Sequence, residues 1–70
     1  MSQLTPRGDY ITLAHALKAA GLSDSGGQSK HLVRQGKVTV NGLPEHKPGR
    51  KLRVGDRFAV SGQPEWTLSG

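Results

Sequence analysis

Basic side chains near the middle of this sequence are the ones best suited to chemistry. Residues 25–44 contain no acid, and their charged or titratable side chains are Lys30, His31, Arg34 and Lys37. Lysine and arginine neutralise phosphate groups and displace the counterions that surround them. The residue types and their spacing therefore point to the binding of an anion, and of a polyanion first.

The charge of the whole chain is concentrated in the same half. Its formal net charge is +5 over 70 residues. Residues 30–57 carry eight Lys or Arg and two acidic residues, a net of +6, whereas the rest of the chain carries a net of −1. This asymmetry favours nucleic acid over a membrane, because no strongly apolar helix face accompanies it. The alternative is a solvated basic surface that only maintains solubility.

Composition restricts the other classes of function. A chain of 70 residues forms one domain with a small core, so a large buried active site is not expected. The absence of cysteine excludes a disulfide framework and agrees with a reducing cytoplasm. No run of residues is as apolar as a signal-peptide core or a membrane span. We expect a cytoplasmic monomer with no membrane partner.

Catalytic and metal-binding interpretations find little support. Gly21 and Gly26 have the outer spacing of a phosphate-binding GxxxxGK loop, but Gly27 replaces the lysine and no strand precedes them. The three histidines are too far apart in sequence to be a ligand pair, and the carboxylates are scattered. We therefore predict a protein that is not an enzyme and that has no cofactor and no metal.

A first helix is predicted after a lead-in over residues 1–11. Thr12 can cap it, because a threonine oxygen accepts a hydrogen bond from one of the first free amides. Apolar residues then recur at helical spacing from Leu13 to Ala20, and Gly21 ends the helix.

A second helix is predicted over residues 26–35, where Ser25 and Gln28 form a capping box. At about 100° per residue, its inner side holds Ser29, Leu32 and Val33. Its outer side holds Lys30, His31 and Arg34. Two cations four residues apart repel each other mildly. We interpret this outer face as one over which an anion lies.

A short antiparallel sheet is predicted in the second half. Residues 37–42, KVTVNG, alternate between apolar and polar and end in the Asn-Gly pair of a hairpin turn. A further strand follows the VGD turn. The residues expected to complete the core from this half are Leu52, Val54, Phe58 and Val60.

Residues 61–70 are predicted to form a flexible tail, because they contain Pro64 and show no clear period. Tyr10 and Trp66 are interpreted as packing residues rather than recognition residues. The domain itself is therefore expected over residues 12–60.

The order of these motifs resembles a known RNA-binding domain. GLSDSGGQSKHLVRQGKVTVNG followed by VGDRFAV is similar to the domain first described in ribosomal small-subunit protein four, also called the alpha-L motif. We call this type S-four-like. The resemblance covers residues 12–60 and is nearest to the small stand-alone bacterial members. It implies an α+β fold in which two N-terminal helices pack on a short antiparallel β-sheet. It also implies binding of structured RNA, meaning ribosomal RNA, a ribosomal particle or tRNA.

The resemblance places the RNA contacts on the second helix and the loop that adjoins it. The predicted RNA-binding side chains are Lys30, His31, Arg34, Lys37, Arg50, Lys51 and Arg53. The resemblance itself assigns this role to Lys30, Arg34 and Lys37, and charge placement adds the others. The exposed amides of Gly26 and Gly27 can bind a phosphate oxygen. The alternative is that these glycines permit close approach of the two helices.

Two departures from the family pattern leave a second hypothesis open. Many members have arginine where this chain has Thr12 and Gly26, so those contacts are not carried over. The chain could instead be a protein-interaction or regulatory module that keeps the fold without binding RNA. Structured RNA is favoured over single strands, because no pair of aromatic residues lies on a strand face to stack bases.

Overall fold

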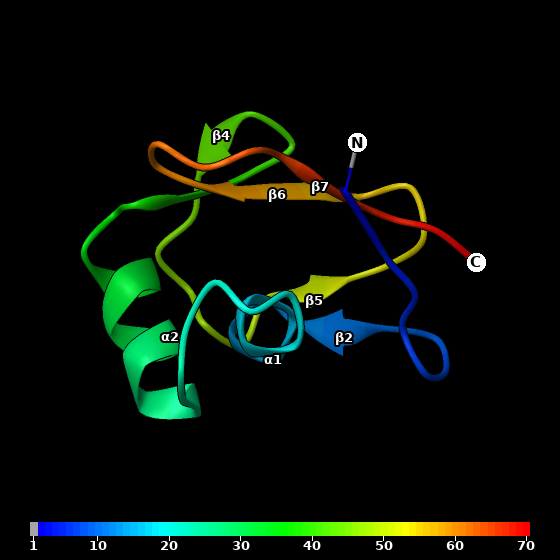
Figure 1. The fold of residues 1–70 in the computed structure, drawn as a ribbon, viewed down its shortest axis with the longest axis horizontal. Helices are drawn as coiled ribbons and strands as arrows, with labels where there is room; N and C mark the ends of the chain where they lie inside the picture. Colours follow the sequence, from blue (N-terminus) through cyan, green and yellow to red (C-terminus); the bar gives the residue numbers. More distant parts are fainter. Residues whose placement is uncertain (1) are drawn as a thin grey trace.

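The computed structural model describes residues 2–70 and places a sheet over two helices (Figure 1). The elements in chain order are β1 (Ser2–Leu4), β2 (Ile11–Thr12), α1 (Leu13–Ala19), α2 (Gly26–Arg34), β3 (Val38–Val40), β4 (Leu43–Pro44), β5 (Lys51–Leu52), β6 (Arg57–Val60) and β7 (Trp66–Leu68). Neither α1 nor α2 is long and apolar enough to cross a membrane.

The main sheet has five strands in the order β1-β7-β6-β3-β4. All neighbours in it are antiparallel except β1 and β7, which are parallel, with Ser2 opposite Trp66. A separate antiparallel ribbon joins β2 to β5 and lies beside α1 (Figure 1). The predicted α+β fold with two helices packed on a sheet is confirmed, and the parallel β1–β7 pair makes the sheet mixed.

Helix α2 begins and ends through local hydrogen bonds that its sequence predicts. The Ser25 Oγ accepts from the Gln28 amide at 3.1 Å, and the Gln28 Oε1 accepts from the Asp24 amide at 2.5 Å. At the other end Gly36 has a φ of 75°, which only glycine adopts without strain, and the Lys37 amide donates to the Leu32 carbonyl at 3.2 Å. The sequence alone therefore determines both limits of this helix.

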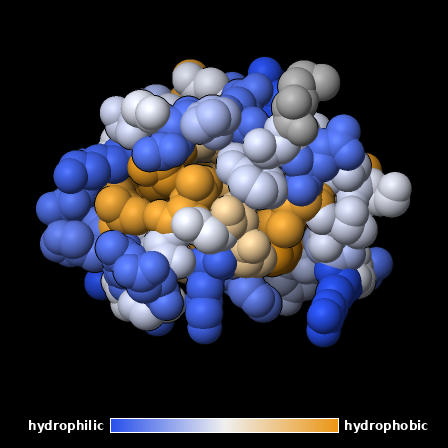
Figure 2. Space-filling model, viewed as in Figure 1, coloured by the Kyte–Doolittle hydropathy of each residue, from blue (hydrophilic) through white to orange (hydrophobic). Residues whose placement is uncertain are grey.

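The core lies between the sheet and the helices. Its fully buried apolar side chains include Leu13, Leu17, Val33, Val38, Leu52, Phe58 and Leu68. The rings of Phe58 and Trp66 stack with centroids 6.4 Å apart, so the packing role predicted for Trp66 is confirmed. Apolar surface reaches the outside in the middle of the face drawn in Figure 2, between the sheet and α1, with hydrophilic residues around it.

Among the described residues, one buried hydrogen bond joins two side chains, and both are serines. Ser29 of α2 is fully buried, and its hydroxyl forms a short hydrogen bond with the Ser23 hydroxyl. Ser23 also donates to the Ser25 carbonyl at 3.3 Å. No buried side-chain polar atom lacks a hydrogen-bond partner within residues 2–70. The loop between the helices is therefore fixed to α2, and the periodicity that places Ser29 inward is confirmed.

Val54 differs from the predicted core. This residue is 59% exposed, because it lies in a turn that the Asp56 amide closes on the Arg53 carbonyl at 2.9 Å. Leu52, Phe58 and Val60 do pack in or against the core, as predicted.

Both ends of the chain also differ from the sequence-based expectation of loose segments. The lead-in contributes β1, and the predicted flexible tail contributes β7, which lies between β1 and β6 in the sheet. Leu68 of β7 is 1% exposed. The short, irregular apolar pattern of residues 66–68 carries no local signal, because its pairing partners lie at distant positions in the sequence.

Replacement of Leu68 by alanine tests whether the end of the chain belongs to the folded core. We expect Leu68→Ala to lower the free energy of unfolding by about 2–5 kcal/mol, because it leaves a cavity among buried side chains. Leu43→Ala is the matched control, since Leu43 is 71% exposed and its loss changes stability by less than about 0.5 kcal/mol. Urea unfolding monitored by Trp66 fluorescence measures both. Equal effects of the two variants would contradict the packed position of β7.

Candidate functional site

The outer face of α2 carries the cations that the sequence groups together. Lys30, His31 and Arg34 are exposed, whereas Ser29 and Val33 on the opposite side are fully buried. The helical spacing of the sequence therefore correctly predicts that these side chains are exposed to solvent. One short helix presents three basic side chains without an intervening acid.

None of these side chains has an acidic partner among residues 2–70. The ion pairs among residues 2–70 join Arg50 to Glu45 and Arg57 to Glu65. Arg34 lies in the last turn of α2, where its positive charge interacts favourably with the helix dipole. Lys30 lies earlier in the helix and gains no such contact. Its like-charged neighbour one turn later makes the outer face a site of unbalanced positive charge.

Lys37 follows shortly after the end of α2. Gly36 turns the chain, and the Lys37 carbonyl accepts from the Ser61 amide at 2.8 Å. The backbone of Lys37 is therefore held between α2 and the end of β6, while its side chain is exposed. A Cβ at position 36 would lie 3.0 Å from the His46 Nε2, so the imidazole of His46 lies next to this turn.

The loop over residues 45–50 joins β4 to β5 in the sequence. In space it passes from the end of α2 to the beginning of α1. Its first residue donates from the Glu45 amide to the Val38 carbonyl at 3.0 Å. At its far end the carbonyls of Pro48 and Arg50 accept from the first two amides of α1, at 3.0 and 2.8 Å. The loop adjoins both helices, and His46 is the residue that it brings to the end of α2. The sequence gives no signal for this position of His46, because no local pattern gives the path of the loop.

Arg50 has a partner inside the protein. Its Nη1 lies 2.6 Å from the Glu45 Oε1. The hydrogen bond from Arg50 lowers the pKa of Glu45, against the smaller opposing effect of burial, and the Lys47 and His46 amides add to the lowering. Part of the charge of Arg50 is therefore used to hold the loop, which weakens its predicted role as a phosphate contact.

Lys51 and Arg53 lie apart from the α2 face. In Figure 1, α1 stands between α2 and β5, which carries Lys51. The Lys51 Nζ lies over the ring of Tyr10, 4.9 Å from its centroid. The seven side chains predicted as one site thus form two groups, an α2 group and a β5 group. The α2 group consists of Lys30, His31, Arg34 and Lys37. The β5 group consists of Arg50, Lys51 and Arg53.

The two glycines at the beginning of α2 lie in open space. Outside the backbone of the helix itself, a Cβ at Gly26 would have no heavy atom within 4 Å, and a Cβ at Gly27 would meet only the Ser25 Oγ at 3.9 Å. Close approach of the helices therefore does not require glycine at either position, and that alternative is wrong. Glycine in the first turn makes a helix less stable than alanine does, because glycine loses more backbone freedom. Nothing in the packing of residues 2–70 offsets this cost.

A network around Asp56 holds the hairpin and the turn before β6 together. The Asn41 amide donates to the Arg57 carbonyl and the Arg57 amide donates to the Asn41 Oδ1, at 2.8 and 2.9 Å. The Asp56 Oδ2 accepts from the Arg53 amide at 2.8 Å, and its Oδ1 accepts from the Asn41 side chain. The Arg53 amide lowers the pKa of Asp56, burial opposes this effect, and the Asn41 hydrogen bond reinforces it.

No group of three or more His, Cys, Asp or Glu residues within residues 2–70 is arranged to hold a metal ion.

Comparison with known proteins gives two findings. A family model described as S4 domain matches residues 4–65. This chain belongs to the S4 domain family. A protein of Bacillus subtilis (strain 168) named probable ribosome maturation protein RlbA is 41% identical over 54 residues, which cover 77% of this chain and 76% of that protein.

Many residues that identify this S4 domain have architectural roles here. Gly36 ends α2, and Asn41 and Gly42, with φ values of 52° and 85°, form the turn between β3 and β4. Asp56 joins that turn to the backbone of Arg53. These residues therefore fix the backbone from which Lys30, Arg34 and Lys37 of the same motif project.

The network around Asp56 predicts how the stability of this S4 domain depends on pH. The folded-state pKa of Asp56 lies below its ordinary value of 3.8, so the stabilising contribution is present above that value. It is lost as the pH falls from 3.8 through the lower folded-state pKa. In Asp56→Asn this acid-dependent loss should be smaller, and stability at pH 7 should fall by about 1–3 kcal/mol, because the Arg53 amide loses a charged acceptor.

Urea unfolding at pH 7, 5, 4 and 3 measures this dependence in the wild type and in Asp56→Asn. Glu45→Gln serves as the comparison. The pKa of Glu45 is also lowered, but its main partner is the Arg50 side chain, which is 44% exposed. Identical pH dependence of the wild type and Asp56→Asn would refute the assigned role of Asp56.

Proposed function

We propose that this chain is a non-catalytic RNA-binding protein. It binds structured RNA, meaning ribosomal RNA, a ribosomal particle or tRNA, mainly through the α2 group of cations. The observation that carries this proposal is the outer face of α2, whose cations have no acidic partner among residues 2–70 in a chain that belongs to the S4 domain family. The relative named as a ribosome maturation protein supports a ribosomal particle in the cytoplasm as the place of action.

The mechanism of binding is electrostatic and depends on shape. Lys30, Arg34 and Lys37 contact phosphates and release counterions, which makes the affinity salt-dependent. His31 adds a donor on the same face, and a second set of phosphate contacts comes from Arg50, Lys51 and Arg53. Because α1 lies between α2 and β5, an RNA that contacts both groups extends across α1. An A-form helix or a folded junction presents phosphates across such a width.

The aromatic residues agree with structured RNA as the main partner. Phe58 is fully buried, and Trp66 is half-buried against it. Neither ring is available on the surface of the sheet as a platform for a series of stacked bases. Contacts to phosphate and sugar therefore provide most of the affinity.

The Gly26 and Gly27 amides at the beginning of α2 provide a phosphate contact in this proposal. The first amides of a helix have no internal acceptor, and the helix dipole favours a negative charge there. The absence of side chains lets a phosphate approach the backbone. Lys30 lies one turn further along the same helix and supplies a neutralising charge nearby.

Removal of two α2 cations tests the interface. We expect Lys30→Gln combined with Arg34→Gln to weaken binding to structured RNA at least tenfold, a loss of about 1.4 kcal/mol or more. The slope of log affinity against log salt should fall by about 1 for each lost phosphate contact. A titration of fluorescent ribosomal RNA fragments, tRNA and a matched single strand at several salt concentrations measures both quantities.

Lys18→Gln combined with Lys47→Gln is the matched control, because it removes the same net charge from exposed positions outside both groups that form no ion pair among residues 2–70. Equal loss in the two double variants would mean that net charge alone drives binding. No RNA binding at low salt, together with a salt-insensitive protein complex, would instead favour the protein-interaction module.

Alanine at the two exposed glycines separates stability from binding. Gly26→Ala combined with Gly27→Ala should raise the free energy of unfolding by about 0.4–1 kcal/mol per site, because alanine favours the helix and meets no close neighbour. RNA affinity should fall, since a methyl group then lies between the backbone amides and the phosphate. Thermal unfolding and the same RNA titration measure the two effects. Stabilisation with unchanged affinity would remove the phosphate contact from the proposal.

A further inference from the structure

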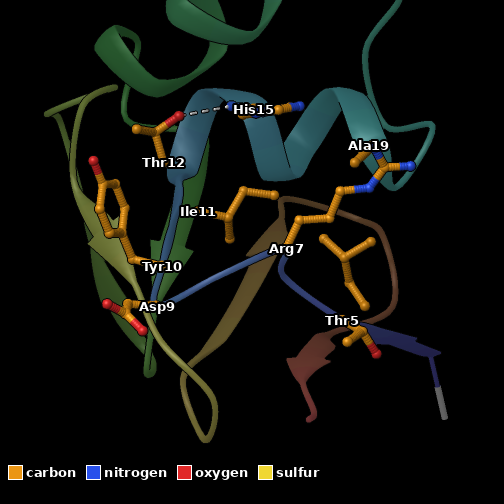
Figure 3. Close-up of a pocket in the computed structure, with 9 residues that line it drawn as sticks. Thr5, Arg7, Asp9, Tyr10, Ile11, Thr12, His15 and Ala19 are labelled. Atoms are coloured by element: carbon orange, nitrogen blue, oxygen red, sulfur yellow. Dashed lines mark hydrogen bonds between the residues drawn. The ribbon is translucent and has the colours of Figure 1, made fainter.

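A groove with a volume of about 840 Å³ lies between the N-terminal segment and α1, outside both groups of cations. It is lined by residues from 4 to 12 and by two positions on the exposed side of α1, His15 and Ala19. Its volume is in the range of pockets that bind small organic molecules. Figure 3 shows Ile11 in the middle of the groove, with polar side chains on either side of it.

Arg7 provides a cation at one end of the groove. Its side chain extends along the groove toward Ala19 at the end of α1 (Figure 3). Arg7 is exposed and takes part in no ion pair among residues 2–70. A guanidinium with this freedom can bind a phosphate through two parallel hydrogen bonds.

Tyr10 provides an aromatic surface at the other end. Its residue is 43% exposed, which differs from the predicted packing role. Lys51 lies over the ring at 4.9 Å from the centroid but does not line the groove, so it approaches the ring from outside. The ring is thus held in place by a cation and remains in contact with the groove. Unstacked bases of RNA bind to aromatic side chains presented in this way.

Asp9 stands beside Tyr10 and provides a hydrogen-bond acceptor. Its carboxylate points away from Arg7 in Figure 3, and the two form no ion pair. Arg7 and Asp9 carry opposite charges but do not pair with each other. Each can therefore bind a different group of one ligand. A carboxylate accepts hydrogen bonds only, and among the bases guanine presents two adjacent donors, N1–H and N2–H, on its Watson–Crick edge.

We propose that this groove binds a single unpaired nucleotide that projects from a structured RNA, with guanine preferred. Its base stacks on Tyr10, the Watson–Crick edge of guanine donates to Asp9, and a phosphate lies against Arg7. Ile11 contacts the apolar face of the nucleotide between these ends. This inference rests on the proposed function, which supplies RNA as the biological ligand. The groove distinguishes one base from another, whereas the α2 interface contacts phosphates of any sequence.

The proposed site and the α2 interface have separate tests. NMR of the ¹⁵N-labelled chain is titrated with GMP, AMP, CMP and UMP. We expect amide shifts confined to residues 4–19, with GMP binding most tightly. Tyr10→Ala should lose these shifts and Tyr10→Phe should keep them, because phenylalanine retains the ring. Asp9→Asn should reduce the preference for GMP over AMP by about tenfold.

Structured RNA is then compared with and without one bulged guanosine. The bulge should strengthen binding of the wild type and of Lys30→Gln with Arg34→Gln by the same factor, and it should not strengthen binding of Tyr10→Ala or Arg7→Gln. GMP shifts at the groove without binding of structured RNA would support the nucleotide site and remove the proposed interface. Normal RNA binding with no GMP shifts and no effect of the bulge would overturn the nucleotide site and leave the proposed function in place.

Discussion

Helix α1 begins with amides that its own residues cannot satisfy. It has seven residues, and a helix of this length is not stable alone in water. The Leu13 and Ala14 amides donate to the carbonyls of Arg50 and Pro48, and the His15 amide donates to the Thr12 Oγ1. The loop of residues 45–50 is therefore part of the cap of α1. Because the same loop begins against β3 and adjoins the turn at Gly36, the relative positions of the helices, the sheet and the basic side chains all depend on it.

Elements that depend on neighbours in the sequence could be predicted well. The caps at Thr12 and Ser25, the inward position of Ser29 and the Asn-Gly turn each follow from interactions within a few residues. Their energies come from local backbone geometry, which a single sequence contains. The outer face of α2 was predictable for the same reason, since helical periodicity alone decides which side chains point to solvent.

Features that depend on the path of an irregular segment could not be predicted. Arg50 and Glu45 both appear free in the sequence, yet the loop brings them into an ion pair. Lys51 appears to be a loop cation, but pairing of β5 with β2 places it on Tyr10. In each case the path of an irregular segment decides the outcome, and that path is set by backbone hydrogen bonds to other elements. The sequence therefore gives the basic side chains of the candidate site, whereas their division into two groups is seen only in the structure.

The parallel pairing of β1 with β7 has a consequence for the synthesis of this protein. Strand β1 is made first, but its neighbour in the sheet is residues 66–68, near the opposite end of the chain. Residues made in between can form α2 and the β3–β4 hairpin early, because those contacts are local. Strand β1 therefore stays unpaired until residues 66–68 have been made and are free to fold. A nascent chain that stops before residue 66 carries an unpaired β1 segment.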